Sequence, residues 1–214
     1  MIELIENPVG LDKAIQDLQI HLKNKISWLE VAYGKATRNT ENKISYPEVF
    51  TNDGTDYKKI APDDNVQAQV FFKVEDPGRV IGEFLPYQNN NFKYRISIIF
   101  WFDLSKIYPE KKYRYNEELK KDIVESLSTF PDFKLEYVYE TAAQIWRDYT
   151  IGNMESRGLR QPFGGYRFEG NLQFIESCIP GAVTPNPVLP KETRIYTLTD
   201  DIHNYILLTN DTVI

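Results

Sequence analysis

The chain has 214 residues, with 31 acidic and 25 basic side chains, a net charge of −6 and a hydrophobic fraction of 42%. This length and apolar content predict one domain, or one domain with a substantial appendage, and exclude wholesale disorder. The acidic balance argues against a nucleic-acid binder that depends on its overall field, because neutralising phosphates takes clustered Lys and Arg. The net charge does not exclude local basic patches.

The cysteine count and the amino-terminal residues restrict the class further. Cys178 is the only cysteine, which excludes an intramolecular disulfide and a cysteine-based metal cluster. The run Met1–Pro8 has no basic region followed by an apolar core, so no secretory signal is expected there. No apolar run approaches the roughly 18 residues of a membrane-spanning helix. We therefore expect a soluble protein that is intracellular when it is made.

The amino-terminal part predicts one helix followed by mixed segments. Residues 10–27 place apolar side chains at helical spacing, and Asn7 is the candidate cap. Residues 28–34 favour a short strand that ends at glycine, and residues 35–43 are polar and typical of a loop. Residues 46–50 predict a short edge strand, because Pro47 cannot donate a backbone hydrogen bond.

The middle of the chain predicts an antiparallel meander. Residues 66–74 alternate apolar and polar side chains, Asp76 to Gly78 form a turn, and residues 79–85 suit a short strand. The segment Phe92 to Leu104 has one apolar face, while its other face is polar at first and becomes apolar at Ile99 and Trp101. Alternate residues of a strand point to opposite sides, so this long strand should have one buried and one half-covered face.

The following segments alternate between helix and strand. Asn116 can cap a helix over 116–128, with acidic residues in its first turn. The spacing of apolar side chains then predicts a strand, a short helix, an exposed glycine-rich loop and a final strand; these cover residues 133–139, 141–149, 151–165 and 166–174. The expected fold class is α+β, a mostly antiparallel sheet flanked by two to three helices.

The composition changes at Cys178. Four prolines lie between residues 179 and 190, which excludes a helix or a central strand there. We predict a folded domain over 1–177 and an extended arm over 178–214. Restricted φ angles reduce the entropy that the arm loses on docking, and its β-prone runs suit strand addition to a neighbouring subunit. A strap over its own sheet is equally compatible. The residues expected at a subunit interface are Pro185, Pro187, Pro190, Ile195, Tyr196 and Leu198.

Residues that carry chemistry are few. His21 and His203 have no partner at metal-ligand or triad spacing, and no dinucleotide, phosphate-loop or nucleophile-elbow motif occurs. The glycine-rich stretch 158–165 suits a surface loop; the alternative is a loop that contacts phosphates or an acidic partner through Arg157, Arg160 and Arg167.

The acidic groups favour turns over a metal site. Asp63, Asp64 and Glu110 are the carboxylates that a small metal-dependent nuclease would need, and Glu110 to Lys112 fits the Glu-x-Lys element of such enzymes. The element follows Pro109 in a charged stretch, and adjacent Asp residues on a strand face opposite sides, so solvated turns are the better interpretation. Asp200 and Asp201 form a second acidic pair. The three tryptophans favour core or interface packing over base stacking.

The order of elements resembles the tail-terminator and neck-ring proteins of tailed bacteriophages. The segments that carry the resemblance cover residues 8–176, namely 10–28, 66–74, 92–104, 116–128, 133–139 and 166–174. The resemblance implies a small α+β fold, without a catalytic motif, that assembles as a ring around the DNA channel. The chain departs from the family in its wide loops near 35–65 and 76–91, in the helical segment 141–149 and in the arm.

These observations predict a structural virion protein, a ring-forming head–tail connector that is not an enzyme and has no catalytic, metal or cofactor site. Its expected partners are copies of itself, neighbouring portal, neck or tail proteins, and duplex DNA that passes without sequence-specific binding; no membrane is expected. An acidic wall would repel that DNA. The expected location is the virion, after synthesis in the bacterial cytoplasm. The alternative is a small metal-dependent nuclease or accessory enzyme of a phage or mobile element.

Overall fold

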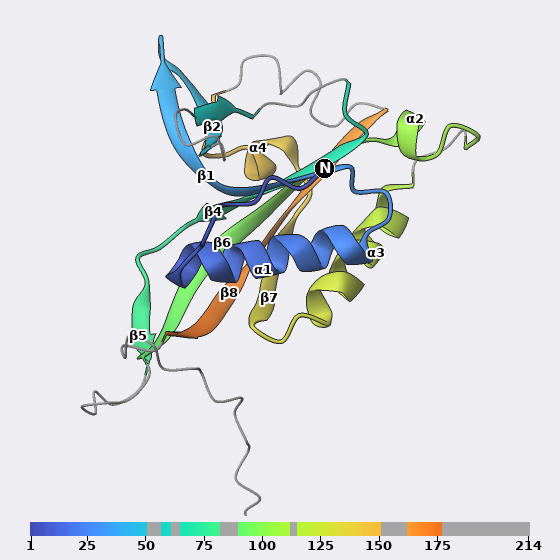
Figure 1. The fold of residues 1–214 in the computed structure, drawn as a ribbon. Coiled ribbons are helices and arrows are strands. Elements are labelled where there is room, and N and C mark those ends of the chain that lie inside the picture. The colour runs from blue at the N-terminus through green and yellow to red at the C-terminus, as the bar shows by residue number, and fades with distance from the viewer. Residues whose placement is uncertain (51–56, 61–64, 82–89, 112–114, 151–161, 177–214) are drawn as a thin grey trace, which may run out of the picture. The chain divides into compact units, whose positions relative to one another are not determined.

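The structure is a computed structural model of the 214-residue chain, and it describes residues 1–50, 57–60, 65–81, 90–111, 115–150 and 162–176. The chain divides into two units, Met1–Pro180 and Gly181–Ile214. The fold below belongs to the first unit. It is mixed α+β, with a mostly antiparallel sheet, as the sequence predicts (Figure 1).

The sheet has eight strands with the order β3-β2-β1-β4-β6-β8-β7, and β5 pairs with β6 beside this path. Neighbouring strands are antiparallel except β1 and β4, which are parallel. The longest pairing joins β6 and β8, from Asn90↔Glu176 to Asp103↔Phe163. The strands are β1 (Val31–Glu41), β2 (Ile44–Phe50), β3 (Tyr57–Lys59), β4 (Ala68–Val74), β5 (Arg79–Ile81), β6 (Asn90–Asp103), β7 (Phe133–Tyr139) and β8 (Phe163–Glu176).

One face of the sheet is covered by two helices, α1 (Gly10–Lys25) and α3 (Asn116–Ser128) (Figure 1). The core beneath them takes the even-numbered side chains of β4, β6 and β8, because alternate residues of a strand share a face. The helical stripe of α1 ends in this core, where Leu18 and Leu22 are fully buried. The two short helices are α2 (Leu104–Ile107) and α4 (Ala142–Ile145).

The opposite face is half covered. Near α4, the odd-numbered side chains join a second core that includes Phe71, Ile99 and Trp101. Toward the β5 end the same face carries Lys93, Arg95 and Ser97. The change from polar to apolar along β6 therefore marks where the cover of α4 begins, as the sequence predicts.

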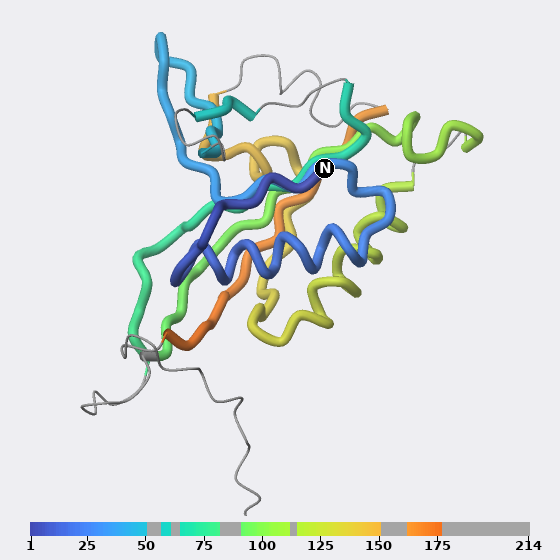
Figure 2. The backbone as a smooth tube through the Cα atoms, in the orientation of Figure 1, coloured from blue at the N-terminus to red at the C-terminus, as the bar shows by residue number. Residues whose placement is uncertain are grey.

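The amino-terminal residues run beside β1 before α1 starts, in the darkest blue of Figure 2. Ile2 bridges Ala32 in parallel, and the backbone N–H of Glu3 donates to Ala32 at 3.2 Å. Gln19 of α1 is buried and donates from Nε2 to the carbonyls of Glu3 and Ala32, each at 2.7 Å. A polar residue on the apolar stripe of α1 thus ties helix, terminal segment and sheet together.

Both predicted helix caps are wrong. α1 begins at Gly10 after Val9, without a side-chain cap, and Asn7 takes a left-handed conformation with φ 51° outside the helix. α3 begins with Asn116 already inside the helix and Tyr115 as the cap residue. Asn tolerates the left-handed region better than other side chains, so Asn7 serves the turn that precedes α1.

The predicted loop 35–43 is wrong for residues 35–41, because β1 continues through Gly34 to Glu41 and pairs with β2. Pairing to a neighbour satisfies the backbone of this polar segment, which local sequence cannot indicate. The turn sits at Asn42 and Lys43, both with positive φ. Pro47 lies in β2, which β1 and β3 flank on its two sides, so the expected edge position is also wrong.

The last strand starts earlier than predicted. β8 begins at Phe163, so Gly164 and Gly165 belong to the sheet rather than to the predicted loop. A Cβ on Gly164 would overlap the ring of Phe102, and one on Gly165 would lie 2.7 Å from the carbonyl oxygen of Phe100. The glycines therefore allow a close approach of β6, which their loop-like composition conceals. The predicted segment 141–149 forms the single-turn helix α4 followed by turns to Tyr149.

Gly170 provides a test of the β7–β8 contact. A Cβ there would overlap the carbonyl oxygen of Lys134 and lie 2.6 Å from the Phe133 ring. We expect Gly170→Ala to lower the free energy of unfolding by about 1–3 kcal/mol, because backbone cannot move aside cheaply. Urea denaturation measures this loss. Gly34→Ala is the matched control, since its new methyl group meets only Gln19 Oε1 at 3.7 Å. Equal losses in both variants would contradict the packing described.

Candidate interaction surface on the open sheet face

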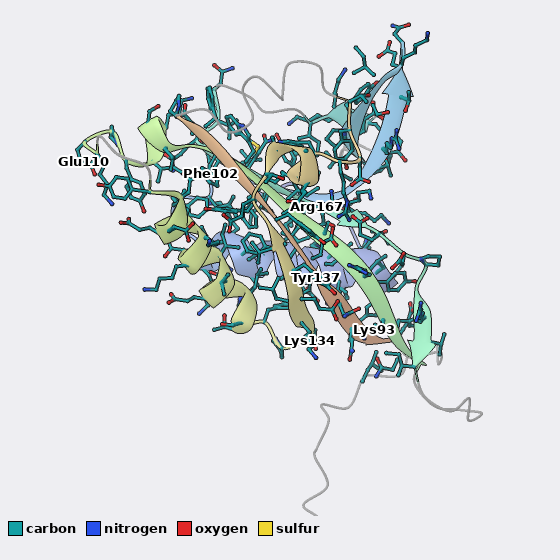
Figure 3. All side chains as sticks on the ribbon, turned by 180° about the vertical axis from the view of Figure 1, so that it is seen from behind. Lys93, Phe102, Glu110, Lys134, Tyr137 and Arg167 are labelled. Atoms are coloured by element: carbon teal, nitrogen blue, oxygen red, sulfur yellow. The ribbon has the colours of Figure 1, made fainter. Side chains whose placement is uncertain are left out.

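The most distinctive polar feature of the described structure is a cluster of charged side chains on the sheet face opposite α1 and α3. Strands β4, β6 and β8, the residue after β4 and the turn after α4 contribute to it. Figure 3 views this face and labels Arg167 beside α4. We call this set the ionic cluster; its members are Lys73, Glu75, Arg95, Ser97, Arg147, Asp148, Arg167 and Glu169.

Arg167 is the centre of the ionic cluster and has no exposed surface. Its Nε donates to Ser97 Oγ at 3.0 Å and to Glu169 at 2.9 Å. Its Nη1 donates to Asp148 at 2.7 Å, and Nη2 donates to Glu75. A buried charge is tolerated when its hydrogen-bonding capacity is met, and every guanidinium nitrogen here has an acceptor.

The turn after α4 is anchored to the sheet by these contacts. Arg167 Nη1 also donates to the carbonyl of Ile145 at 3.2 Å, so one guanidinium holds both Ile145 and Asp148. Lys73 reaches Asp148 at 3.1 Å from the other side. The cover that α4 gives to the second core therefore depends on a polar attachment at its carboxyl-terminal end.

Two carboxylates of the ionic cluster, Glu75 and Asp148, are stabilised in their charged form. Burial by itself would raise the pKa of Glu75, but hydrogen bonds from Lys73 and Ser97 and the charge of Arg167 lower it below its ordinary value. Burial likewise opposes the charged form of Asp148, but Arg167 and Lys73 lower its pKa. Positive neighbours therefore outweigh desolvation at both sites.

Two arginines of the ionic cluster, Arg95 and Arg147, are partly exposed, and each lies over a tyrosine ring. Arg147 reaches Glu169 at 2.5 Å and lies over the Tyr139 ring, 5.4 Å from its centroid. Arg95 reaches Glu169 at 3.1 Å and lies 5.5 Å from the Tyr137 ring centroid. Burial would lower the pKa of Arg95, but Glu169 and the more distant Asp76 and Glu136 raise it. Tyr137 stays half exposed, so an aromatic surface faces outward over the charges.

Beyond the ionic cluster, the open face becomes basic. Arg79 of β5 is the cross-strand partner of Lys93 on β6, and Lys134 of β7 is the partner of Asn171 on β8. Among the described residues, neither Arg79, Lys93 nor Lys134 forms an ion pair. We call Arg79, Lys93, Arg95 and Lys134 the basic row.

A separate hollow of about 510 Å³ lies where the starts of α3 and α4 meet β8, with Tyr166 in its wall. Its carboxylates are Glu117 and Glu140, and both contact the ammonium group of Lys120, at 2.5 and 2.8 Å. One lysine therefore pairs with both carboxylates of this hollow. The ionic cluster has a fully buried arginine, and the basic row has cations without an ion pair among the described residues; these two features, rather than the hollow, are taken as the candidate site.

The alternative of a loop that contacts phosphates through Arg157, Arg160 and Arg167 loses one of its three arginines. Arg167 is buried inside β8 and committed to the ionic cluster. Arg157 and Arg160 lie outside the described residues. The sequence around a single arginine on a strand does not indicate that its side chain is buried. The alternation of Arg167, Glu169 and Asn171 with apolar residues could have indicated a polar face of the sheet.

The nuclease carboxylates are not brought together by any described contact. Glu110 is exposed on the connection between α2 and α3, far from Arg167 in Figure 3. Asp63 and Asp64 lie outside the described residues. Within the described ranges, no three His, Cys, Asp or Glu side chains form a group that could hold a metal ion.

The remaining predicted site residues cannot be placed. Residues 177–214, which include the six expected interface residues Pro185, Pro187, Pro190, Ile195, Tyr196 and Leu198, lie outside the described part of the chain.

The predicted burial of the tryptophans is confirmed, since Trp28, Trp101 and Trp146 are 7%, 1% and 6% exposed. His21 packs between α1 and α3, with Nε2 at 2.9 Å from the carbonyl oxygen of Ser126.

Comparison with known proteins gives no match: neither a protein-family model nor a curated protein sequence corresponds to this chain. Among the described residues, no helix is both long and apolar enough to cross a membrane.

The ionic cluster predicts a large effect of removing its central cation. In Arg167→Met, buried Glu169 and the partly buried Glu75 and Asp148 lose their shared partner, and we expect a loss of about 3–5 kcal/mol in the free energy of unfolding. Lys13→Met is the control, because the Lys13–Asp17 pair is 60% and 50% exposed and should contribute less than about 1 kcal/mol. Urea denaturation followed by circular dichroism compares them. Similar small losses in both variants would show that the cluster is not a structural anchor.

The lowered pKa values predict acid sensitivity. Asp148 has a folded-state pKa below its ordinary value of 3.8, so it stabilises the fold above that pH, and this stabilisation is lost as the pH falls through the folded pKa. Asp148→Asn should therefore differ most from wild type at neutral pH, and the difference should shrink below about pH 4. Urea denaturation at several pH values gives the comparison. A constant difference across this range would contradict the assigned ionisation.

Proposed function

We propose that the chain is a non-catalytic structural subunit that forms a ring in the head–tail junction of a tailed bacteriophage, around the DNA channel. Copies of the chain join head to tail, and neighbouring portal, neck or tail proteins stack on the ring. The observation that supports this most directly is that the two ends of the described strand order, β3 and β7, are unlike edges that each carry exposed apolar side chains.

The first edge is β3, with the end of β2 beside it. Phe50 and Tyr57 stack edge to face at 5.4 Å between ring centroids and are 45% and 52% exposed. Within the described ranges, no strand pairs with the outer side of β3. An exposed aromatic pair beside open backbone groups is suited to a partner strand or loop.

The second edge is β7, at the other end of the strand order. Its Tyr137 and Val138 are 50% and 37% exposed, and no other described strand pairs with its outer side. A head-to-tail ring needs two unlike surfaces that complement each other, because each subunit meets its neighbours through different patches. The β3 and β7 edges provide two such patches on one rigid sheet.

The charged groups of the sheet support a structural role as well. In the ionic cluster, the carboxylates are held by arginine and lysine in a fixed geometry. This arrangement rigidifies the face between the two edges, which keeps their relative orientation constant from copy to copy. The arm after Cys178 would add reach between subunits, and the net charge of −6 suits a wall that DNA passes without adhering.

Single-edge variants test the head-to-tail arrangement. Phe50→Asp and Val138→Asp each place a charge on one exposed edge, and we expect both to leave the fold intact and to stop ring formation. Mixing the two variants should yield a one-to-one dimer, because each retains one working edge. Native mass spectrometry counts the subunits, and Val9→Asp, at a residue 74% exposed ahead of α1, is the control that still forms rings.

Electron microscopy of the wild-type assembly should then show a ring with a central opening that admits duplex DNA. A wild-type chain that stays monomeric at every concentration, alone and with neck proteins, would overturn the proposal. Cleavage of DNA that depends on added Mg²⁺ or Mn²⁺ and is lost in Glu110→Ala would establish the nuclease instead.

A further inference from the structure

The basic row places like charges side by side: Arg79, Lys93 and Lys134 form no ion pair with another described residue, whereas Arg95 pairs with Glu169 at 3.1 Å. Arg79 and Lys93 are direct cross-strand partners on one face of β5 and β6, an arrangement that lowers the stability of the sheet. Lys93 and Arg95 alternate along β6 and share that face, and Lys134 lies across β8 from Arg95, since both pair with Asn171. Figure 3 shows Lys93 and Lys134 at the same end of the sheet.

The surrounding surface adds apolar contacts. Ile81 and Ile175 both pair with Asn91 of β6, so they share the open face at its far end, where they are 40% and 59% exposed. At the other side of the basic row lies half-exposed Tyr137. The exposed carboxylates that act on Arg95 are Asp76 and Glu136, and Glu136 also accepts a hydrogen bond from Asn171. The three other cations of the basic row, Arg79, Lys93 and Lys134, form no ion pair with a described residue.

We propose that the basic row is the docking site for residues 200–214 of a neighbouring copy of this chain. The inference rests on the proposed ring and names the surface that receives the arm. Segment 200–214 contains Asp200, Asp201 and Asp211 and no Lys or Arg. The same segment carries Ile202, Ile206, Leu207 and Leu208, which match the flanking isoleucines.

Charge and polarity together favour this occupant over nucleic acid. A phosphate backbone would pair with Arg79, Lys93 and Lys134, but it would leave Ile81 and Ile175 exposed to water. An acidic aliphatic segment pairs with the cations and covers the isoleucines at once. The sequence of segment 200–214 contains both elements within 15 residues.

The length of chain after β8 is sufficient to reach another subunit. β8 ends at Glu176, beside β5 and β6, and Asp200 lies 24 residues further along the chain. A chain of that length spans at most roughly 80 Å when fully extended. A covalent link therefore does not prevent the segment of one copy from reaching the basic row of the next.

Charge exchange in the full-length chain tests the pairing. Lys93→Glu with Lys134→Glu should weaken assembly roughly tenfold, and Asp200→Lys with Asp201→Lys should weaken it similarly. All four substitutions in one chain should restore assembly, because the attraction is re-formed with reversed sign. Lys25→Glu with Lys121→Glu, on α1 and α3, is the control with the same change in net charge. Assembly is read as the concentration of half-dissociation by light scattering.

Mixed cross-linking decides which copy supplies the segment. One preparation carries Lys134→Cys and the other Asp201→Cys, both with Cys178→Ser. Mild oxidation of the mixture should give disulfide-linked dimers, whereas Lys25→Cys in place of Lys134→Cys should not.

Two results would overturn the inference: no rescue in the fourfold variant, or no disulfide-linked dimer in the mixture of the Lys134→Cys and Asp201→Cys preparations. If either result is obtained and the wild-type chain still forms rings, the docking site is refuted and the proposed function is unaffected. Cross-linked dimers without any ring would refute the ring and retain the docking site.

Discussion

The pairing of β6 with β8 is the constraint on which the rest of the described structure depends. Fourteen residues of each strand are in register, from Asn90↔Glu176 to Asp103↔Phe163. Because side chains alternate along both strands, this one register assigns the aromatic residues to the helix face and the charged residues to the other. A shift by one residue would bury Arg167 and Glu169 under α1 and expose the aromatic core.

The two faces then follow different physical rules. On the helix face, α1 and α3 cover a continuous apolar core, and stability comes from area removed from water. On the other face, buried charge is tolerated because Arg167 satisfies three carboxylates and is itself saturated. The ionic cluster fixes α4, and α4 in turn covers Trp101 and Phe71.

The division of polar groups indicates what the open face is suited to do. The ionic cluster holds its charges in internal pairs, whereas the cations Arg79, Lys93 and Lys134 form no ion pair with another described residue. Charges of the first kind stabilise a scaffold; uncompensated like charges of the second kind are suited to a partner that brings the opposite sign. The proposed ring and the proposed docking of segment 200–214 use these two features separately.

The sequence by itself determined the elements with strong periodicity: helix α1, strands β4, β6 and β7, helix α3 and the α+β class, because side-chain spacing reports a local period. It also indicated the half-covered face of β6. Only the tertiary structure decided the extension of β1 to Glu41, the start of β8 at Phe163 and the burial of Arg167. Those features arise from partners distant in sequence, which supply hydrogen bonds and counter-charges that no local pattern contains.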